Sequence, residues 1–142
     1  MTQINLEKDT LLKEVLSTDY ALVTYNPVLK IGKVEWKGKA SSEEYQKAII
    51  SLIQHAEKHP VHYYLADISK QSVVSPEDRK WFENIMVPKA IGLGLKKAAV
   101  VFNGNVFKKY YVNMILQVTG KLGLSLKMFN KEEEAVQWFL KE

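Results

Sequence analysis

The chain has 142 residues, 46% hydrophobic and 25% charged, with a formal net charge of +4, so it is long enough for one domain with a single core. It contains no cysteine, which excludes disulfides, thiolate metal sites and a cysteine nucleophile and favours a reducing environment. No signal peptide occupies the first nine residues and no apolar run is long enough to cross a bilayer, so we expect a cytoplasmic protein without a transmembrane segment.

The N-terminal part of the chain predicts strands that pair in an antiparallel way. Early strands are expected at residues 12–17 and 20–26, and Asn26-Pro27 is typical of a turn. From Val28 to Trp36, apolar side chains alternate with charged ones, as in a strand with one face in water. We therefore expect an N-terminal antiparallel hairpin.

A helix with a clear start signal follows. Ser41 and Glu44 have the spacing of a capping box, in which each side chain satisfies the other's free backbone N–H. The apolar stripe behind them predicts a helix that ends near Pro60. Residues 62–67 then predict a short buried strand.

The next helix is predicted from Ser75 as N-cap, with Pro76 at its first position. Pro88 is expected to end or kink this helix, because proline lacks the N–H of the helical hydrogen bond. Its predicted inner face consists of Trp81, Phe82, Ile85 and Met86.

The C-terminal third continues the alternation. Residues 97–102 are almost all apolar, as in a parallel strand covered on both faces. A helix from Phe107, with Gly120 as its expected C-cap, leads to a strand at 125–129. Asn130 is expected to cap the last helix together with Glu133.

Strands that alternate with helices in this way predict an α/β fold. We expect a single domain over residues 1–142, built from a mainly parallel sheet with helices packed on it. The crossovers between parallel strands should be right-handed. The N-terminal hairpin adds an antiparallel edge to this sheet.

Polar side chains gather where two of the predicted strands end. In an open α/β sheet, ligand and partner sites form at this edge. If the two strands are neighbours, their polar residues line one crevice, although Asp67 is better explained as an acceptor for the backbone of the following loop. The candidate crevice consists of Asp67, Ser69, Ser72, Asn103 and Asn105.

Histidines and glycines give no metal or nucleotide signature. His55 and His59 are four residues apart, but Glu57 is one place late for the zinc-protease order His-Glu-x-x-His. The dipole at a helix C-terminus explains these histidines without a metal. The glycines around Gly92 precede a strand instead of following one. We expect no metal and no cofactor.

A resemblance to a known family rests on the element order and three short segments. These are Trp36-Lys37-Gly38 before the first helix, Leu65-Ala66-Asp67 at a strand end, and Pro76-Glu77-Asp78-Arg79-Lys80-Trp81 at a helix start. Together they resemble the SpoIIAA-like (STAS/CRAL-TRIO-like) superfamily, in particular short single-domain bacterial members of unassigned function. The resemblance implies a non-enzymatic module. Some such modules are anti-sigma-factor antagonists switched by serine phosphorylation, and related lipid-transfer folds carry lipid in a pocket.

The resemblance implies candidate phosphorylation sites after the central strand. Ser69 and Ser72 are these candidates, although the Asp-Ser-Ser-Gly type segment of the antagonists is absent. A phosphate there would carry about two negative charges, which the dipole at a helix N-terminus favours. Ser75 has a structural role as N-cap instead.

The charge pattern bears on partners. Residues 84–131 contain eight lysines and no acid, which favours an anionic partner such as lipid headgroups, although solvated lysine faces explain the pattern as well. Arg79 is the single arginine. Because arginine supplies the forked contacts that read guanine, we expect no sequence-specific nucleic-acid binding.

Three hypotheses for function follow. We favour a non-enzymatic regulatory module that binds another protein or a second copy of itself through an exposed edge strand or an apolar helix face. The alternative is a small-molecule or lipid carrier, which requires an apolar cavity beneath the helices of Trp81 and Phe107. The least favoured is a hydrolase that uses Asp67 with a histidine. His62 is excluded from that role, because it lies roughly 16 Å from Asp67 at the other end of a strand.

Overall fold

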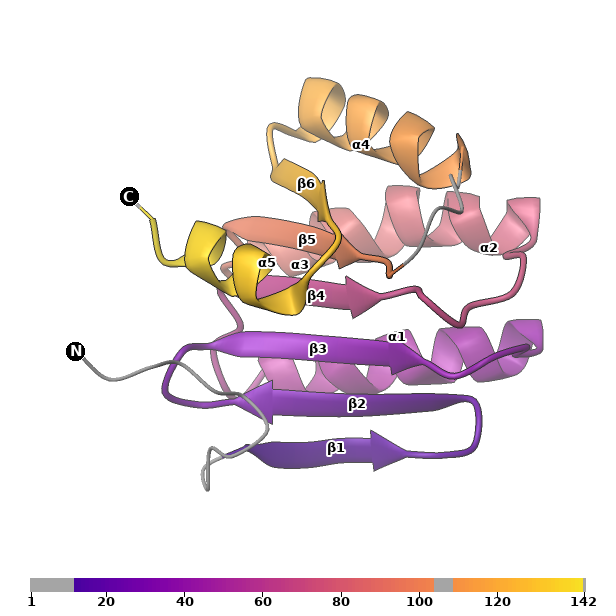
Figure 1. Cartoon of the computed structure of the whole chain (residues 1–142), viewed down its shortest axis with the longest axis horizontal. Coiled ribbons are helices and arrows are strands. Elements are labelled where there is room, and N and C mark those ends of the chain that lie inside the picture. Colours follow the sequence, from indigo (N-terminus) through magenta and orange to yellow (C-terminus); the bar gives the residue numbers. More distant parts are fainter. Residues whose placement is uncertain (1–11, 104–108, 142) are drawn as a thin grey trace.

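The structure, a computed structural model, describes residues 12–103 and 109–141 and contains one six-stranded sheet with helices on both faces (Figure 1). The strands are β1 (Lys13–Ser17), β2 (Ala21–Asn26), β3 (Ile31–Trp36), β4 (Tyr63–Asp67), β5 (Lys97–Val101) and β6 (Ser125–Phe129). The helices are α1 (Ser42–Ala56), α2 (Pro76–Trp81), the π-helix η1 (Phe82–Met86), α3 (Val87–Gly92), α4 (Lys109–Leu122) and α5 (Glu132–Phe139). The predicted α/β class is confirmed.

The sheet is antiparallel at its N-terminal side and parallel elsewhere. β1, β2 and β3 form an antiparallel meander, and β3 to β6 pair in parallel. The turn between β2 and β3 is held by Asn26, whose side-chain oxygen accepts hydrogen bonds from the N–H groups of Val28 and Leu29. This confirms the turn and the N-terminal antiparallel hairpin.

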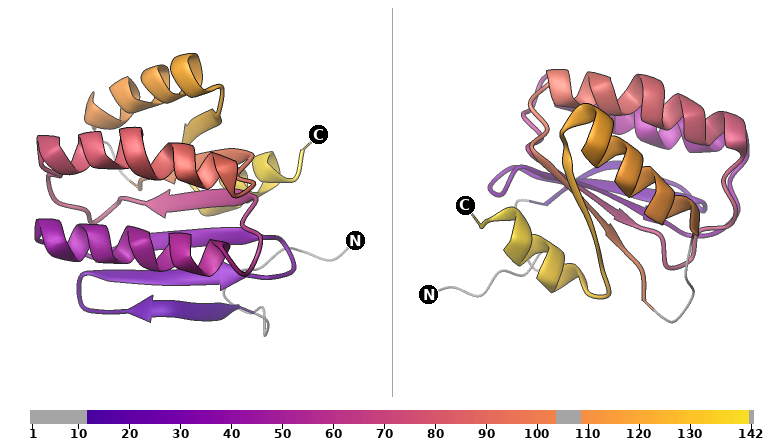
Figure 2. Two further views of the ribbon diagram at one scale, coloured as in Figure 1. Left: turned by 180° about the vertical axis from the view of Figure 1, so that it is seen from behind. Right: turned by 90° about the horizontal axis from the view of Figure 1, so that it is seen from above.

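The strands lie in the sheet in the same order as in the sequence, so each new strand is added on the same side of the one before it. Right-handed crossovers that always advance the same way place their helices on one face of the sheet. Accordingly, α1, the α2–η1–α3 helix and α4 form a layer on one face, and α5 covers the other (Figure 2). None of the described helices is long and apolar enough to cross a membrane.

Two apolar clusters hold these layers together. The larger lies between the sheet and the layer of three helices, and the smaller lies between the sheet and α5. Because side chains alternate along a strand, neighbouring residues serve different clusters. On β5, for example, Ala98 belongs to the larger cluster and Ala99 to the smaller one.

Both predicted helix starts are confirmed. The Ser41 side chain accepts from the Glu44 N–H, and the Glu44 carboxylate accepts from the Ser41 N–H. The Ser75 hydroxyl accepts from the Asp78 N–H, with Pro76 at the first helical position. These contacts fix where α1 and α2 begin.

The prediction for Pro88 and Ile85 needs correction. Pro88 does not end the helix, which winds into the π segment η1 and continues through α3 to Gly92. In η1 the Val87 N–H bonds to the Phe82 carbonyl five residues earlier, and a π turn of this kind rotates the later side chains. As a result, Ile85 is 54% exposed and Val87 faces the core in its place, while the prediction that Met86 faces the core is confirmed.

Two predicted caps are also wrong. Gly120 lies inside α4, which continues to Leu122, and Gly123 follows with a positive φ of 71°. The last helix begins at Glu132, and its N-cap is Lys131, which makes no side-chain cap hydrogen bond. Three glutamates in the first turn of α5 stabilise that end through the helix dipole instead of a cap. The predicted start of the preceding helix, Phe107, lies outside the described residues.

Candidate functional site

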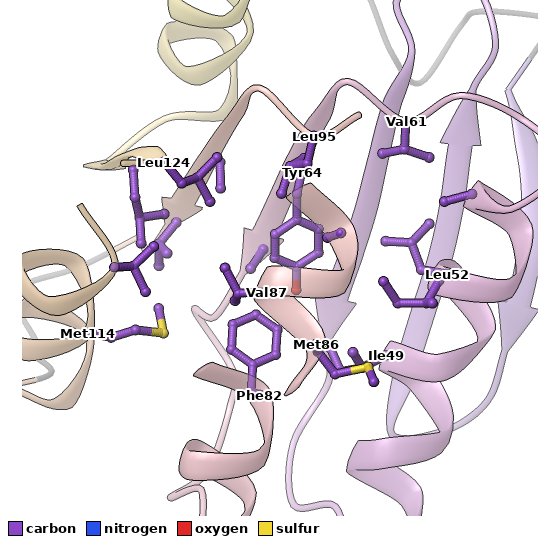
Figure 3. Close-up of a pocket in the computed structure, with 18 of the residues that line it drawn as sticks. Ile49, Leu52, Val61, Tyr64, Phe82, Met86, Val87, Leu95, Met114 and Leu124 are labelled. Carbon is purple, nitrogen blue, oxygen red and sulfur yellow. The ribbon is translucent and has the colours of Figure 1, made fainter. Parts of the chain in front are cut away.

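An apolar cavity lies between the sheet and the layer of three helices (Figure 3). Its volume is about 70 Å³. Helices contribute Ile49 and Leu52 from α1, Phe82 and Met86 from η1 and Met114 from α4, while Leu124 closes it near β6. An apolar cavity therefore lies beneath these helices, at the place that the carrier hypothesis expected.

The chemistry of the cavity wall is uniform. Among the described lining residues, only Trp36, Tyr45 and Tyr64 contain nitrogen or oxygen in their side chains, and none is charged. Tyr64 extends across the middle of the cavity. Burial raises the pKa of the Tyr64 hydroxyl, so the group stays protonated. No hydrogen bond to this hydroxyl occurs within the described part of the chain, so it is available as a donor.

The size of the cavity limits what it holds as it stands. An engineered cavity of about 150 Å³ accepts benzene. At about 70 Å³ this cavity holds a group of only a few carbon atoms. A larger ligand needs the helices to separate. The wall includes η1, and π segments of this kind occur frequently at functional sites.

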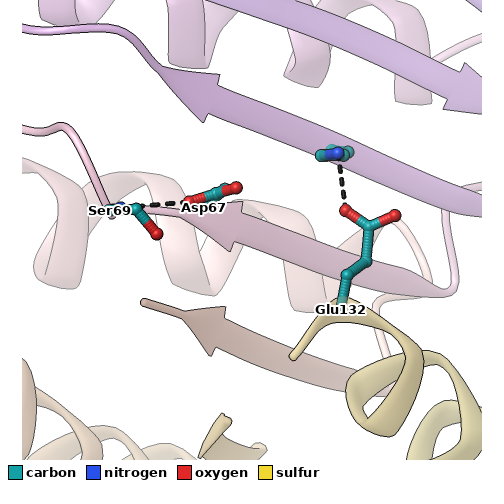
Figure 4. Close-up of polar contacts among 4 residues, drawn as sticks. Asp67, Ser69 and Glu132 are labelled. Carbon is teal, nitrogen blue, oxygen red and sulfur yellow. Dashed lines mark hydrogen bonds and ion pairs between the residues drawn. The ribbon is translucent and has the colours of Figure 1, made fainter. Parts of the chain in front are cut away.

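The predicted crevice residues are brought together in part. The Asp67 carboxylate accepts a hydrogen bond from the Ser69 N–H at 3.0 Å (Figure 4), and the Ser69 hydroxyl accepts one from the Asn103 N–H at 2.8 Å. β4 and β5 are neighbours, as this grouping requires. Asn105 lies outside the described residues. Asp67 thus acts at least as the local acceptor for the loop backbone.

Ser72 lies elsewhere, on a second hollow at the same edge of the sheet. This crevice has a volume of about 120 Å³ and lies between the loop 71–75 and the first turns of α1 and α2. Its deepest polar group is Asp78, which is only 3% exposed and whose Oδ1 accepts hydrogen bonds from Ser42 Oγ (2.8 Å) and Gln46 Nε2 (3.1 Å). Sequence reasoning assigned Asp78 no site. The one available signal was its position three residues after the cap Ser75.

The histidines form an aromatic cluster at the end of α1. The rings of His55 and His59 stack at 4.6 Å, and the edge of Tyr25 meets His55 at the same distance. His55 Nε2 is buried without a hydrogen-bond partner in the described structure. Burial, then the charges of His59 and Lys13, lower the pKa of His55. No group of three metal-ligating side chains occurs among the described residues.

Some lysines of the lysine-rich segment 84–131 make contacts within the fold. Lys97 Nζ donates to the carbonyls of Trp138 (2.8 Å) and Lys141 (2.7 Å) and lies over the Trp138 ring. Lys89 pairs with Glu57 at 3.8 Å. The lysine pattern in this segment is therefore not purely a binding feature.

The edges and the outer helix face bear on protein partners. β1 is an edge strand, but its end carries exposed Lys13 and Glu14 and a register shift between Glu14 and Leu16, features that discourage pairing with another strand. Ile85 on η1 and Leu116 on α4 are large apolar side chains that are more than half exposed.

Comparison with models of protein families gave a match to the model described as SpoIIAA-like. The match spans residues 31–140, from the first residue of β3 to the residue after α5. It includes the cavity and the crevice but not β1 and β2. Neither the curated proteins nor the solved structures compared with the chain gave a match.

Proposed function

The chain belongs to the SpoIIAA-like family, whose domains are typically regulatory or binding modules, and on this premise we propose that it is a non-catalytic module that binds a small apolar ligand or the apolar part of a larger one. The observation that carries the proposal is the apolar cavity between the sheet and the helices. The hydrophobic effect favours transfer of an apolar group from water into such a site.

The residues around the cavity support binding without catalysis. A catalytic acid, base or nucleophile must lie within hydrogen-bonding reach of the reacting group. The described lining contains no carboxylate, histidine, lysine, serine or threonine. Asp67 and His62 lie at opposite ends of β4, so the hydrolase hypothesis gains no support from the geometry.

Tyr64 supplies the polar contact that would orient a ligand. Its protonated hydroxyl donates to an acceptor such as a carbonyl or ether oxygen. A ligand with an apolar body and one acceptor atom therefore fits the site better than a pure hydrocarbon. This follows because the acceptor satisfies a hydroxyl that has no described partner.

The test compares two variants that add the same two methyl groups on opposite faces of β5. Ala98→Val fills part of the cavity, whereas Ala99→Val enlarges the side chain that faces α5. Each protein is incubated with an extract of host cells and examined by native mass spectrometry before and after denaturation. Benzene serves as the defined probe. It enters only if the helices separate to widen the cavity, and its binding is followed by methyl NMR shifts.

We expect wild type and Ala99→Val to carry an apolar compound that is lost on denaturation, and Ala98→Val to carry none. Benzene should bind Ala98→Val at least about tenfold more weakly, since each 1.4 kcal/mol is a factor of ten. A folded wild type that binds neither benzene nor any extract component contradicts the proposal.

A second candidate is binding of a protein partner, either another protein or a second copy of the chain. It is favoured by Ile85 and Leu116, which expose large apolar side chains on the outer helices. Analytical ultracentrifugation of wild type against Ile85→Glu and Leu116→Glu tests the self-association form. A concentration-dependent dimer that either substitution dissolves supports this candidate.

A further inference from the structure

The crevice beside Ser72 is built by segments that are far apart in the sequence. Its walls are Trp36 at the end of β3, the segment before α1, the loop 71–75 and the start of α2. The Ser72 N–H lies 3.5 Å from the Gly38 carbonyl, which ties the loop to the opposite wall. A volume of about 120 Å³ leaves space for a small organic group. By volume it corresponds to about four water molecules at ~30 Å³ each.

A buried carboxylate with spare acceptor capacity borders this space. Both donors that reach Asp78, from Ser42 and Gln46, bond to Oδ1, and no ion pair or hydrogen bond reaches Oδ2 within the described part of the chain. An ionised carboxylate offers about four acceptor positions. A carboxylate that is 97% buried is stable only when its charge is compensated, and two neutral donors compensate it incompletely.

Two aromatic residues also line the crevice. The rings of Trp36 and Tyr45 stack at 5.0 Å with an interplanar angle of 16°, and both residues line the crevice. Aromatic faces attract cations, most strongly when the cation is removed from water. A crevice lined by one carboxylate and two aromatic residues therefore favours a cation with an apolar surface.

From this arrangement we propose that the crevice binds an organic ammonium group. A metal ion fits poorly, because hard cations require several oxygen ligands and Asp78 is the sole carboxylate in the described lining. Trp36 and Tyr45 line both the crevice and the apolar cavity, whereas Asp78 lines the crevice alone. The proposal stands independently of the cavity's ligand.

An anion is the main competing occupant, because α1 and α2 both begin at the crevice and helix N-termini attract anions. However, the N–H groups of Glu44 and Asp78 are already bonded to the cap serines. Lys37, Lys39 and Lys70 are exposed in the adjoining segments, and none of them lines the crevice. The Asp78 carboxylate repels an anion placed there.

The test compares choline with 3,3-dimethylbutan-1-ol, which has the same shape and no charge. Binding is followed by the tryptophan indole signals in ¹H–¹⁵N NMR spectra, with inorganic phosphate as a third probe. We expect choline to bind the wild type at least about tenfold more tightly than its neutral analogue, in keeping with the ~2 kcal/mol of a desolvated cation–π contact.

Two variants separate the role of Asp78 from general charge. Asp78→Asn keeps an oxygen that accepts from Ser42 and Gln46 and should abolish the preference for choline. Glu77→Gln removes the same charge from the exposed neighbouring residue and should keep it. Equal binding of choline and the alcohol to the wild type overturns the proposal, as does tighter binding of phosphate. If Asp78→Asn does not fold, the wild-type comparison alone decides.

Discussion

His55 Nε2 is buried without a hydrogen-bond partner in the described structure, whereas Asp78 is a buried residue whose Oδ1 accepts two hydrogen bonds, and the consequences differ. Asp78 borders open space, so a ligand can complete its contacts. His55 Nε2 is enclosed beside Tyr25 and His59, so its unmet hydrogen bond lowers the stability of the fold. Asp78 therefore marks a candidate site, and His55 leads to a pH dependence of stability.

Replacing His55 with phenylalanine should flatten the response of the protein to acid. The pKa of His55 is lowered in the fold, so the unfolded chain binds a proton that the folded chain resists. The wild-type free energy of unfolding should therefore fall as pH drops below about 6.5, the ordinary histidine pKa, and level off below the folded pKa. Urea unfolding between pH 8 and pH 5 measures this.

In His55→Phe this part of the pH dependence should be missing. At pH 8 His55 is neutral in both the folded and the unfolded state, so the comparison of the two proteins at this pH serves as the internal control. There the variant should be more stable by about 1 kcal/mol, because an unpaired buried polar atom is gone and the ring contact with Tyr25 is kept. Parallel pH curves for the two proteins would show that His55 does not cause the acid sensitivity.

At the scale of elements, local signals predicted starts and strands well and ends poorly. The caps Ser41 and Ser75 were readable because each serine side chain bonds to the backbone N–H three residues later and has a second local signal beside it, Glu44 for Ser41 and Pro76 for Ser75. The π turn of η1 could not be predicted, because it is a feature of the backbone hydrogen bonds that no residue type in this segment signals. A regular helical period therefore assigned Ile85 to the core, whereas Val87, two residues later, lies there.

The attachment of α5 depends on a contact between distant residues. Lys97, on β5, donates to two carbonyls at the C-terminal end of α5, where a cation also interacts favourably with the helix dipole. Lys97→Met should cost about 1–3 kcal/mol of stability, the range for hydrogen bonds from a charged group. Lys96→Met, at the exposed neighbouring position, is the matched control and should change stability little.

Hydrogen exchange resolves where this loss occurs. Amides of α5 should exchange faster in Lys97→Met, while those of α1 keep the rate set by global unfolding. Equal protection of α5 in the Lys97 and Lys96 variants would mean that the apolar cluster of Ala135, Val136 and Phe139 alone holds this helix.

For the whole molecule, the strand order decides where a site can form. Ligands in open α/β sheets bind where the strand order reverses, and this sheet has no reversal. The crevice expected at Asp67 and Asn103 lies at the ends of β4 and β5, away from any such reversal, and it stays a prediction. The alternation of elements predicted the sheet. The cavity arises from packing of α1, η1 and α4 on the sheet, and the crevice arises between the loop 71–75 and the first turns of α1 and α2, and no local sequence pattern records either arrangement.

A fold that keeps an apolar cavity gives up packing energy, and this leads to a prediction about the whole molecule. Filling the cavity should stabilise the protein while it removes binding, the usual trade between stability and function. Ala98→Val should raise the free energy of unfolding by about 1–2 kcal/mol, the transfer free energy of the two added carbon atoms at about 0.8 kcal/mol each.

Ala99→Val provides the contrast, because Ala99 is fully buried against α5 and overpacking there costs about 1–3 kcal/mol. Urea unfolding at pH 8 measures both variants, and the two changes should have opposite signs. If both substitutions destabilise the protein equally, the space beside Ala98 is already filled in solution, and apolar-ligand binding loses its structural basis. If only Ala98→Val stabilises the protein, the cavity is unfilled in solution, as the proposed binding of an apolar ligand requires.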